Sequence, residues 1–289
     1  MASIDALDWS IGSLSPYPCE PSKERMHFNF DFTAVQTLWT LTLAAHLVLL
    51  VVLLGRDRAR RFRWFFIGIA LVTLRLIASR LLFGRMPQLT LGEIFLALAL
   101  VSAIVGLLVI VELSRAIFRG ASRGAWVVTS IAVLAACALV MAAWGPWPTW
   151  ASVVPNSIYN ALNLLQLVTQ KGGMLVDLLS VALGVLAALL GRRFGAGWRS
   201  HAQQIVIGLS MASLGQLATQ GIWLAITKTA HPHSMDEYAH MMGLREKLLN
   251  ANSALYVLVL IAWIVWLWRD EPGSAAPAAD QPSEPAPEA

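Results

Sequence analysis

Seven apolar stretches, each about long enough to cross a bilayer, fill most of this 289-residue chain. They cover residues 33–54, 64–83, 91–113, 125–144, 173–190, 203–226 and 248–268. A helix of roughly 20 apolar residues spans the hydrocarbon core, and it pairs its backbone groups within one segment, as lipid requires. The stretches are continuously apolar, whereas membrane strands alternate. We therefore expect an all-α polytopic membrane protein, a bundle of seven transmembrane helices.

The overall composition agrees with a membrane protein. Hydrophobic residues make up 57% of the chain and charged residues 13%, whereas a soluble domain carries about 25% charged residues. Arginine outnumbers lysine, and alanine and leucine are abundant, a pattern typical of a GC-rich bacterial genome. We expect a multi-pass protein of a bacterial inner membrane, with the lipid bilayer as its first partner.

The positions of the arginines predict an orientation. Basic residues favour cytoplasmic loops, and they gather in residues 56–63, 115–123 and 192–199 and at Arg269. These positions follow the first, third, fifth and seventh stretches, so the N-terminus is expected outside and the C-terminus in the cytoplasm. The net charge of +4 then reflects membrane topology and gives no reason to expect a nucleic-acid partner.

The predicted domain organisation is simple. Residues 1–32 form a polar outer tail, residues 33–269 the transmembrane domain, and residues 270–289 a cytoplasmic tail. This tail is rich in proline and alanine and carries five acids and no base, so it is expected to be disordered. The amphipathic residues 156–170 are expected to form a helix on the outer surface. The alternative is an outward extension of the fifth membrane helix, with Gly172 and Gly173 as a hinge.

Charged and amide side chains at membrane depth are the strongest functional signal, because their burial in lipid is costly. Arg75 lies about 16 Å into its helix at 1.5 Å per residue, and Asp177 lies near the outer end of the fifth stretch. Gln203, Ser210, Ser213, Gln216, Gln220 and Thr227 share one helical arc. We expect a ligand pocket open to the outside, formed by Arg75, Ser79, Asp177, Gln216, Gln220 and Asn252.

Each of these signals has a structural alternative. Serine and glutamine side chains commonly join membrane helices by hydrogen bonds, and a buried Arg–Asp pair can be purely structural. Glu112 and Arg115 are three residues apart and are expected to form an interfacial ion pair. His46 is alone within its stretch, which favours a packing role.

The residue pattern predicts no catalytic or metal site. Neither of the two cysteines lies in a metal-binding spacing, and no nucleophile and base stand at a catalytic spacing. A microbial rhodopsin would need a lysine for retinal in the last stretch, and residues 248–268 contain none. We expect no cofactor, no metal and no enzymatic activity.

Two arginine-rich segments carry a resemblance to known proteins. Residues 191–205 and residues 55–62, GRRFGAGWRSHAQQI and GRDRARRF, resemble segments of uncharacterised bacterial inner-membrane proteins of similar length. The resemblance implies the seven-helix architecture and no activity, and it transfers no site residues.

Taken together, these observations favour a non-enzymatic sensing or partner-binding module. It would bind a small polar or anionic ligand, or a membrane partner, at the outer pocket, and its inner arginines would contact lipid or a cytoplasmic protein. The alternative is a small-solute or ion transporter that uses Arg75 and Asp177. Transport needs polar groups on both sides of a site, and the inner half offers few. The ligand itself is not predicted.

Overall fold

The computed structural model describes residues 33–82, 85–120, 122–144, 147, 158–190, 200–230 and 234–270. These residues form eight α-helices and no strand. The helices are α1 (Ala34–Gly55), α2 (Arg58–Arg61), α3 (Arg63–Leu82), α4 (Gln88–Ile117), α5 (Arg123–Ala143), α7 (Ile158–Leu190), α8 (His201–Thr229) and α9 (Met235–Trp268). All except the short α2 are long and apolar enough to cross a membrane. The predicted all-α architecture is confirmed for the described residues, with seven helices whose length and composition fit a membrane bundle.

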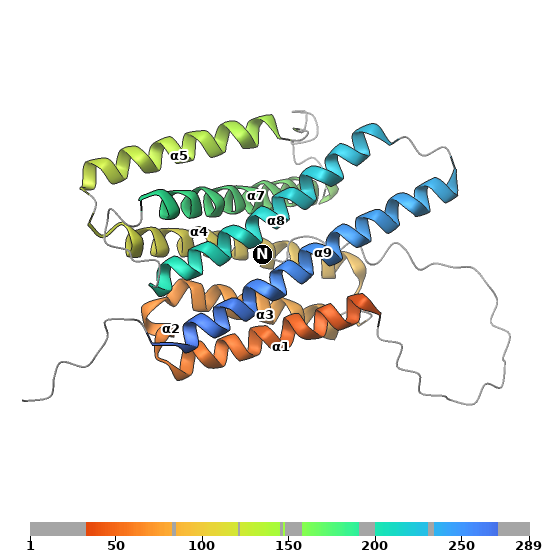
Figure 1. Cartoon of the computed structure of the whole chain (residues 1–289). Coiled ribbons are helices and arrows are strands. Elements are labelled where there is room, and N and C mark those ends of the chain that lie inside the picture. Colours follow the sequence, from red (N-terminus) through yellow and green to blue (C-terminus); the bar gives the residue numbers. More distant parts are fainter. Residues whose placement is uncertain are drawn as a thin grey trace, which may run out of the picture.

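Six of the long helices close into a ring. Contacts run from α1 to α3, then through α4, α7, α8 and α9 back to α1, and α4 also touches α8 across the ring (Figure 1). Helix α5 lies outside this ring, against α7. The helices of the ring can therefore line a common interior, whereas most of the surface of α5 faces away from the bundle.

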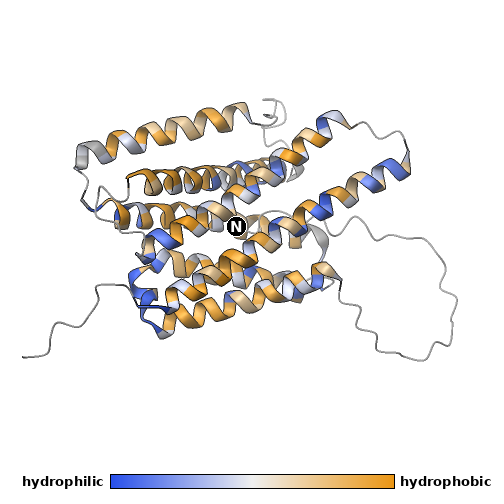
Figure 2. Cartoon of the chain, in the orientation of Figure 1, coloured by the Kyte–Doolittle hydropathy of each residue, from blue (hydrophilic) through white to orange (hydrophobic). Residues whose placement is uncertain are grey.

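Arginines gather at one end of the ring, and we call this end the arginine end. It comprises residues 56–63, Arg115, Arg119 and Arg269. The helix ends at this side are among the most hydrophilic parts of the chain (Figure 2). Asp57 has a left-handed backbone (φ 53°) that reverses the chain between α1 and α2. Arg58 then donates a hydrogen bond from Nη2 to the Arg269 carbonyl at 2.6 Å, so this turn is hydrogen-bonded to the residue that follows α9.

Helix starts follow from local side chains. The hydroxyl oxygens of Thr33, Ser200 and Ser234 accept main-chain N–H bonds and cap α1, α8 and α9. Helix α3 begins differently, because the Glu112 carboxylate of α4 accepts the N–H groups of Trp64 at 3.1 Å and Phe65 at 3.2 Å. A carboxylate suits the positive end of a helix dipole. The expected ion pair of Glu112 with Arg115 is wrong, since no such pair occurs among the described side chains.

The half of the ring nearer the arginine end is filled by a continuous apolar core. Leu49, Leu53, Leu113, Leu260 and Leu267 have no exposed surface there, and together they come from α1, α4 and α9. Large apolar side chains of this kind fill most of the space between the helices, although Gln203 of α8 is also fully buried near this end. The core therefore separates the arginine end from the middle of the ring.

Glycines allow some helices to approach closely. A Cβ added at Gly106 would lie 2.8 Å from a methyl of Val176, and one at Gly184 would collide with the Ser210 side chain. Small residues at helix contacts let membrane helices pack tightly. These two positions join α7 to both of its principal neighbours in the ring.

The predicted surface helix over residues 156–170 is wrong. Ile158–Leu190 is one continuous helix of 33 residues, as in the alternative of an extended fifth helix, but without a hinge. Residues 158–190 contain no proline, and a glycine costs only about 1 kcal/mol relative to alanine in a helix. Gly172 instead faces α4, since a Cβ there would meet Ala103 at 3.6 Å.

Helix α9 is also longer than expected, because it begins at Met235 rather than near residue 248. Most of residues 231–247, which precede the seventh apolar stretch, are therefore helical. The two tails predicted over residues 1–32 and 270–289 lie outside the described residues, apart from Asp270. So do residues 191–199 of the arginine-rich segment.

Candidate functional site

Several buried polar side chains lie beyond the apolar core, further from the arginine end. We call Arg75, Asp177, Ser213, Gln216 and Asn252 the polar layer. The first four are buried, with exposed fractions of 8%, 5%, 1% and 8%, and Asn252 is half-buried. Ionisable groups inside membrane helices are costly and commonly functional.

Two short hydrogen bonds connect helices within this layer. The Ser213 hydroxyl of α8 donates to Asp177 Oδ1 of α7 at 2.9 Å. Three residues further along α8, Gln216 Oε1 accepts from Asn252 Nδ2 of α9 at 2.7 Å. Since a Cβ added at Gly215 would lie 2.8 Å from Asn252 Oδ1, the glycine makes room for this amide. The layer thus joins α7, α8 and α9 side by side.

The structure brings together only part of the predicted pocket. Asp177, Gln216 and Asn252 enter the bonds described above, and Arg75 is buried on α3. Ser79 is half-buried, and its hydroxyl donates to the Leu76 carbonyl of its own helix at 2.7 Å. Gln220 is half-buried on α8.

Ser213 was absent from the six predicted pocket residues, although it is the direct partner of Asp177. The sequence signal for it existed, because Ser213 lies on the same helical arc as Gln216. The partner of Asp177 was not predictable, since the arc alone does not show which helix faces it.

A second buried polar pair joins α1 to α9. His46 Nδ1 lies 2.7 Å from the Thr42 carbonyl and Nε2 lies 3.0 Å from the Tyr256 hydroxyl. A carbonyl only accepts hydrogen bonds, so in the neutral imidazole Nδ1 carries the hydrogen and Nε2 accepts from Tyr256. His46 has no exposed surface. Its role in holding two helices together fits the packing role that the sequence favoured.

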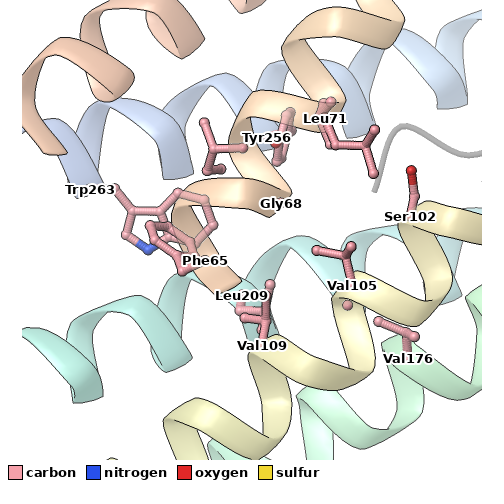
Figure 3. Close-up of a pocket in the computed structure, with 13 residues that line it drawn as sticks. Phe65, Gly68, Leu71, Ser102, Val105, Val109, Val176, Leu209, Tyr256 and Trp263 are labelled. Atoms are coloured by element: carbon pink, nitrogen blue, oxygen red, sulfur yellow. The ribbon is translucent and has the colours of Figure 1, made fainter. Parts of the chain in front are cut away.

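A cavity of about 60 Å³ lies inside the ring beside these groups. Side chains from α3, α4, α7, α8 and α9 surround it (Figure 3). Valine, leucine, isoleucine and phenylalanine make up most of its wall, together with Ser102, Tyr256 and Trp263. None of the six predicted pocket residues lines this cavity.

The cavity and the polar layer are nevertheless neighbours along the helices. Val72, Leu209 and Tyr256 line the cavity, and each lies within about one turn of a residue of the polar layer: Arg75, Ser213 and Asn252 respectively. Val176 lines the cavity directly before Asp177. The interior of the ring therefore changes from apolar to polar within a single helical turn.

The arrangement brings polar and apolar groups together in one part of the bundle. The polar layer offers a carboxylate, amides and a guanidinium, and the cavity beside it offers an apolar wall. Within the described part of the chain, no three His, Cys, Asp or Glu side chains gather as metal ligands do.

Comparisons with known proteins add no relative. No protein-family model, no curated protein and no solved structure matches this chain.

Proposed function

We propose that this chain is a non-enzymatic sensing or partner-binding module of a bacterial inner membrane. Its polar layer would take a small polar or anionic ligand, or the polar group of a membrane partner. The observation that supports this proposal most is the burial of Arg75 and Asp177 in one half of a membrane bundle. Placing such charges away from water is costly. Ionisable side chains inside membrane helices are therefore commonly paired with one another or used for binding.

The orientation forms part of the same proposal. With the arginine end in the cytoplasm, as positive charge favours, the polar layer lies in the outer half of the bilayer. Arg56, Arg60, Arg61 and Arg63 are exposed at that end, where they would meet anionic headgroups or a cytoplasmic partner. Reporter fusions after residue 60 and after residue 245 test this assignment, and a periplasmic signal after residue 60 would reverse it.

Transport through Arg75 and Asp177 is the second candidate function. It is supported by the depth of the two charges, but a transport route needs polar groups on both sides of the site. Around the fully buried Leu53, Leu113 and Leu260, the described residues at the arginine end offer few buried polar side chains, chiefly His201 and Gln203 of α8. Binding without passage therefore has more support.

A paired measurement on the purified protein distinguishes the two functions. Thermal stability in nanodiscs is recorded with phosphate, sulfate, acetate and glutamate, and uptake of the same solutes is measured in proteoliposomes. A stabilising shift without uptake supports binding. Uptake that disappears in Arg75→Lys or Asp177→Asn, variants that retain the size of the side chain, would favour transport instead.

The matched control is Glu246→Gln, because Glu246 is an exposed carboxylate on α9. Binding at the polar layer predicts that Asp177→Asn alters the ligand-induced shift whereas Glu246→Gln leaves it unchanged. Equal shifts in both variants and in the wild type would place the binding site elsewhere.

A further inference from the structure

We propose that the cavity inside the ring binds the hydrocarbon chain of a single-chain amphiphile whose polar group lies against the polar layer. The inference rests on the proposed binding function and specifies the class of ligand. It depends on the hydrogen-bonding state of the cavity wall, on the shape of the cavity, and on the change from apolar to polar residues at one side of it.

The wall has three side chains with hydrogen-bond donors, and each donor is already engaged. The Tyr256 hydroxyl donates to His46 Nε2, the Ser102 hydroxyl donates to the Leu98 carbonyl at 2.7 Å, and Trp263 Nε1 donates to the Gln204 carbonyl at 3.3 Å. A carboxylate, phosphate or carbonyl group inside the cavity would lose its hydration without gaining a donor, which is costly. The wall therefore favours hydrocarbon.

The two ends of the cavity have different neighbours. Phe65 and Trp263 are the lining residues nearest the arginine end on α3 and α9, and their rings meet edge to face with centroids 5.1 Å apart. They form its floor, next to the apolar core (Figure 3). Leu71, Ser102 and Tyr256 line the part of the cavity that lies further from the arginine end, next to the polar layer. If the end of the amphiphile's hydrocarbon chain lies against Phe65 and Trp263, its polar group lies at the polar layer.

The volume points to one chain. A cavity of about 60 Å³ exceeds the space that a single water molecule needs, so it has room for a short segment of a single chain. The lining belongs to helices that span the membrane, where hydrocarbon is the surrounding medium. An amphiphile dissolved in the bilayer is therefore already present around the helices that line the site.

Photolabelling tests this assignment. The full-length protein in phosphatidylcholine nanodiscs is irradiated with a dodecyl alcohol that carries a diazirine near its chain end, with and without excess unlabelled dodecanol. Mass spectrometry then locates the label. We expect saturable labelling around Val105, Leu209 and Trp263 that excess dodecanol reduces several-fold. Labelling of the lipid-facing residues should not saturate, because bulk lipid has no limited number of sites.

Two substitutions on α4 serve as variant and control. Val105 is 7% exposed and lines the cavity, whereas Val101, one turn away, is 46% exposed. Val105→Phe should abolish the saturable labelling, and Val101→Phe should retain it. Ser102→Leu, at a half-buried part of the wall, provides a second way to fill the cavity if Val105→Phe does not fold.

Three results would overturn the inference. These are labelling that dodecanol does not reduce, unchanged saturable labelling in a folded cavity-filling variant, and equal saturable labelling by a phosphatidylcholine with a diazirine in its acyl chain.

The thermal shifts with phosphate and carboxylates are measured in parallel. If those shifts occur without cavity labelling, only this inference fails, whereas labelling without any shift removes the proposed polar ligand and leaves the cavity site.

Discussion

Replacing Gly208 by alanine should destabilise the bundle, although alanine is the better helix former. A Cβ at this position would lie 2.7 Å from Cε2 and 3.0 Å from Cζ2 of Trp263, and would also collide with Nε1. The indole cannot simply turn away. Its N–H is bonded to the Gln204 carbonyl, and its ring is packed edge to face against Phe65.

The expected magnitude follows from two opposing contributions. Overpacking a filled interior costs about 1–3 kcal/mol, and exchanging glycine for alanine in a helix gains about 0.5–1 kcal/mol. Gly243 on α9 provides the matched control, since nothing lies within 4 Å of an added Cβ there. The helix contribution is common to both variants, so their unfolding free energies should differ by about 1–3 kcal/mol, with Gly208→Ala the less stable.

Unfolding by SDS in mixed micelles, followed by circular dichroism, measures this difference. A Trp263→Phe background adds a second test, because it removes the indole atoms that the new methyl group would meet. The cost of Gly208→Ala should then fall, and the double-mutant cycle should show coupling. Equal midpoints for Gly208→Ala and Gly243→Ala, or a cost unaffected by Trp263→Phe, would refute the reasoning.

Two further predictions concern polar contacts between helices. Glu112→Ala should lower the unfolding free energy by about 1 kcal/mol, because the first N–H groups of α3 lose their acceptor. Glu246→Ala, at an exposed carboxylate, should change the unfolding free energy little. Equal losses for the two variants in the same SDS titration would contradict the capping role. Gln216→Leu and Asn252→Leu should each lower the unfolding free energy by about 1 kcal/mol, because their mutual hydrogen bond is lost. The double variant should lose less than the sum of the two single losses. Strictly additive losses would show that the two side chains are not coupled.

Hydropathy was sufficient to predict the helices that cross the membrane, because lipid leaves the backbone few alternatives. It was less successful where a helix leaves the bilayer. Residues 158–172 and 235–247 are polar enough to be taken for a surface helix and a loop, yet both continue a membrane helix. Helix continuation depends on the absence of proline and on the cap at Ser234, whereas hydropathy measures only the preference for lipid.

The polar layer was predicted in part. Asp177, Gln216 and Asn252 were recognised because charges and amides are rare in apolar stretches. Their partners depend on which helices are neighbours in the ring, and periodicity within one helix does not contain that information. The cavity was not predicted at all. It is lined by valines and leucines indistinguishable in the sequence from those that face lipid.

The lengths of α8 and α9 have a geometric consequence. At 1.5 Å per residue, their 29 and 34 residues measure roughly 44 and 51 Å, well beyond a hydrocarbon thickness of about 30 Å. Both extend past the neighbouring helices at the end opposite the arginines (Figure 1), where the Arg245 guanidinium lies 5.3 Å from the ring centroid of Trp223. Helices of this length must tilt or project beyond the hydrocarbon core, and the contact of Arg245 with Trp223 keeps these two together at that end.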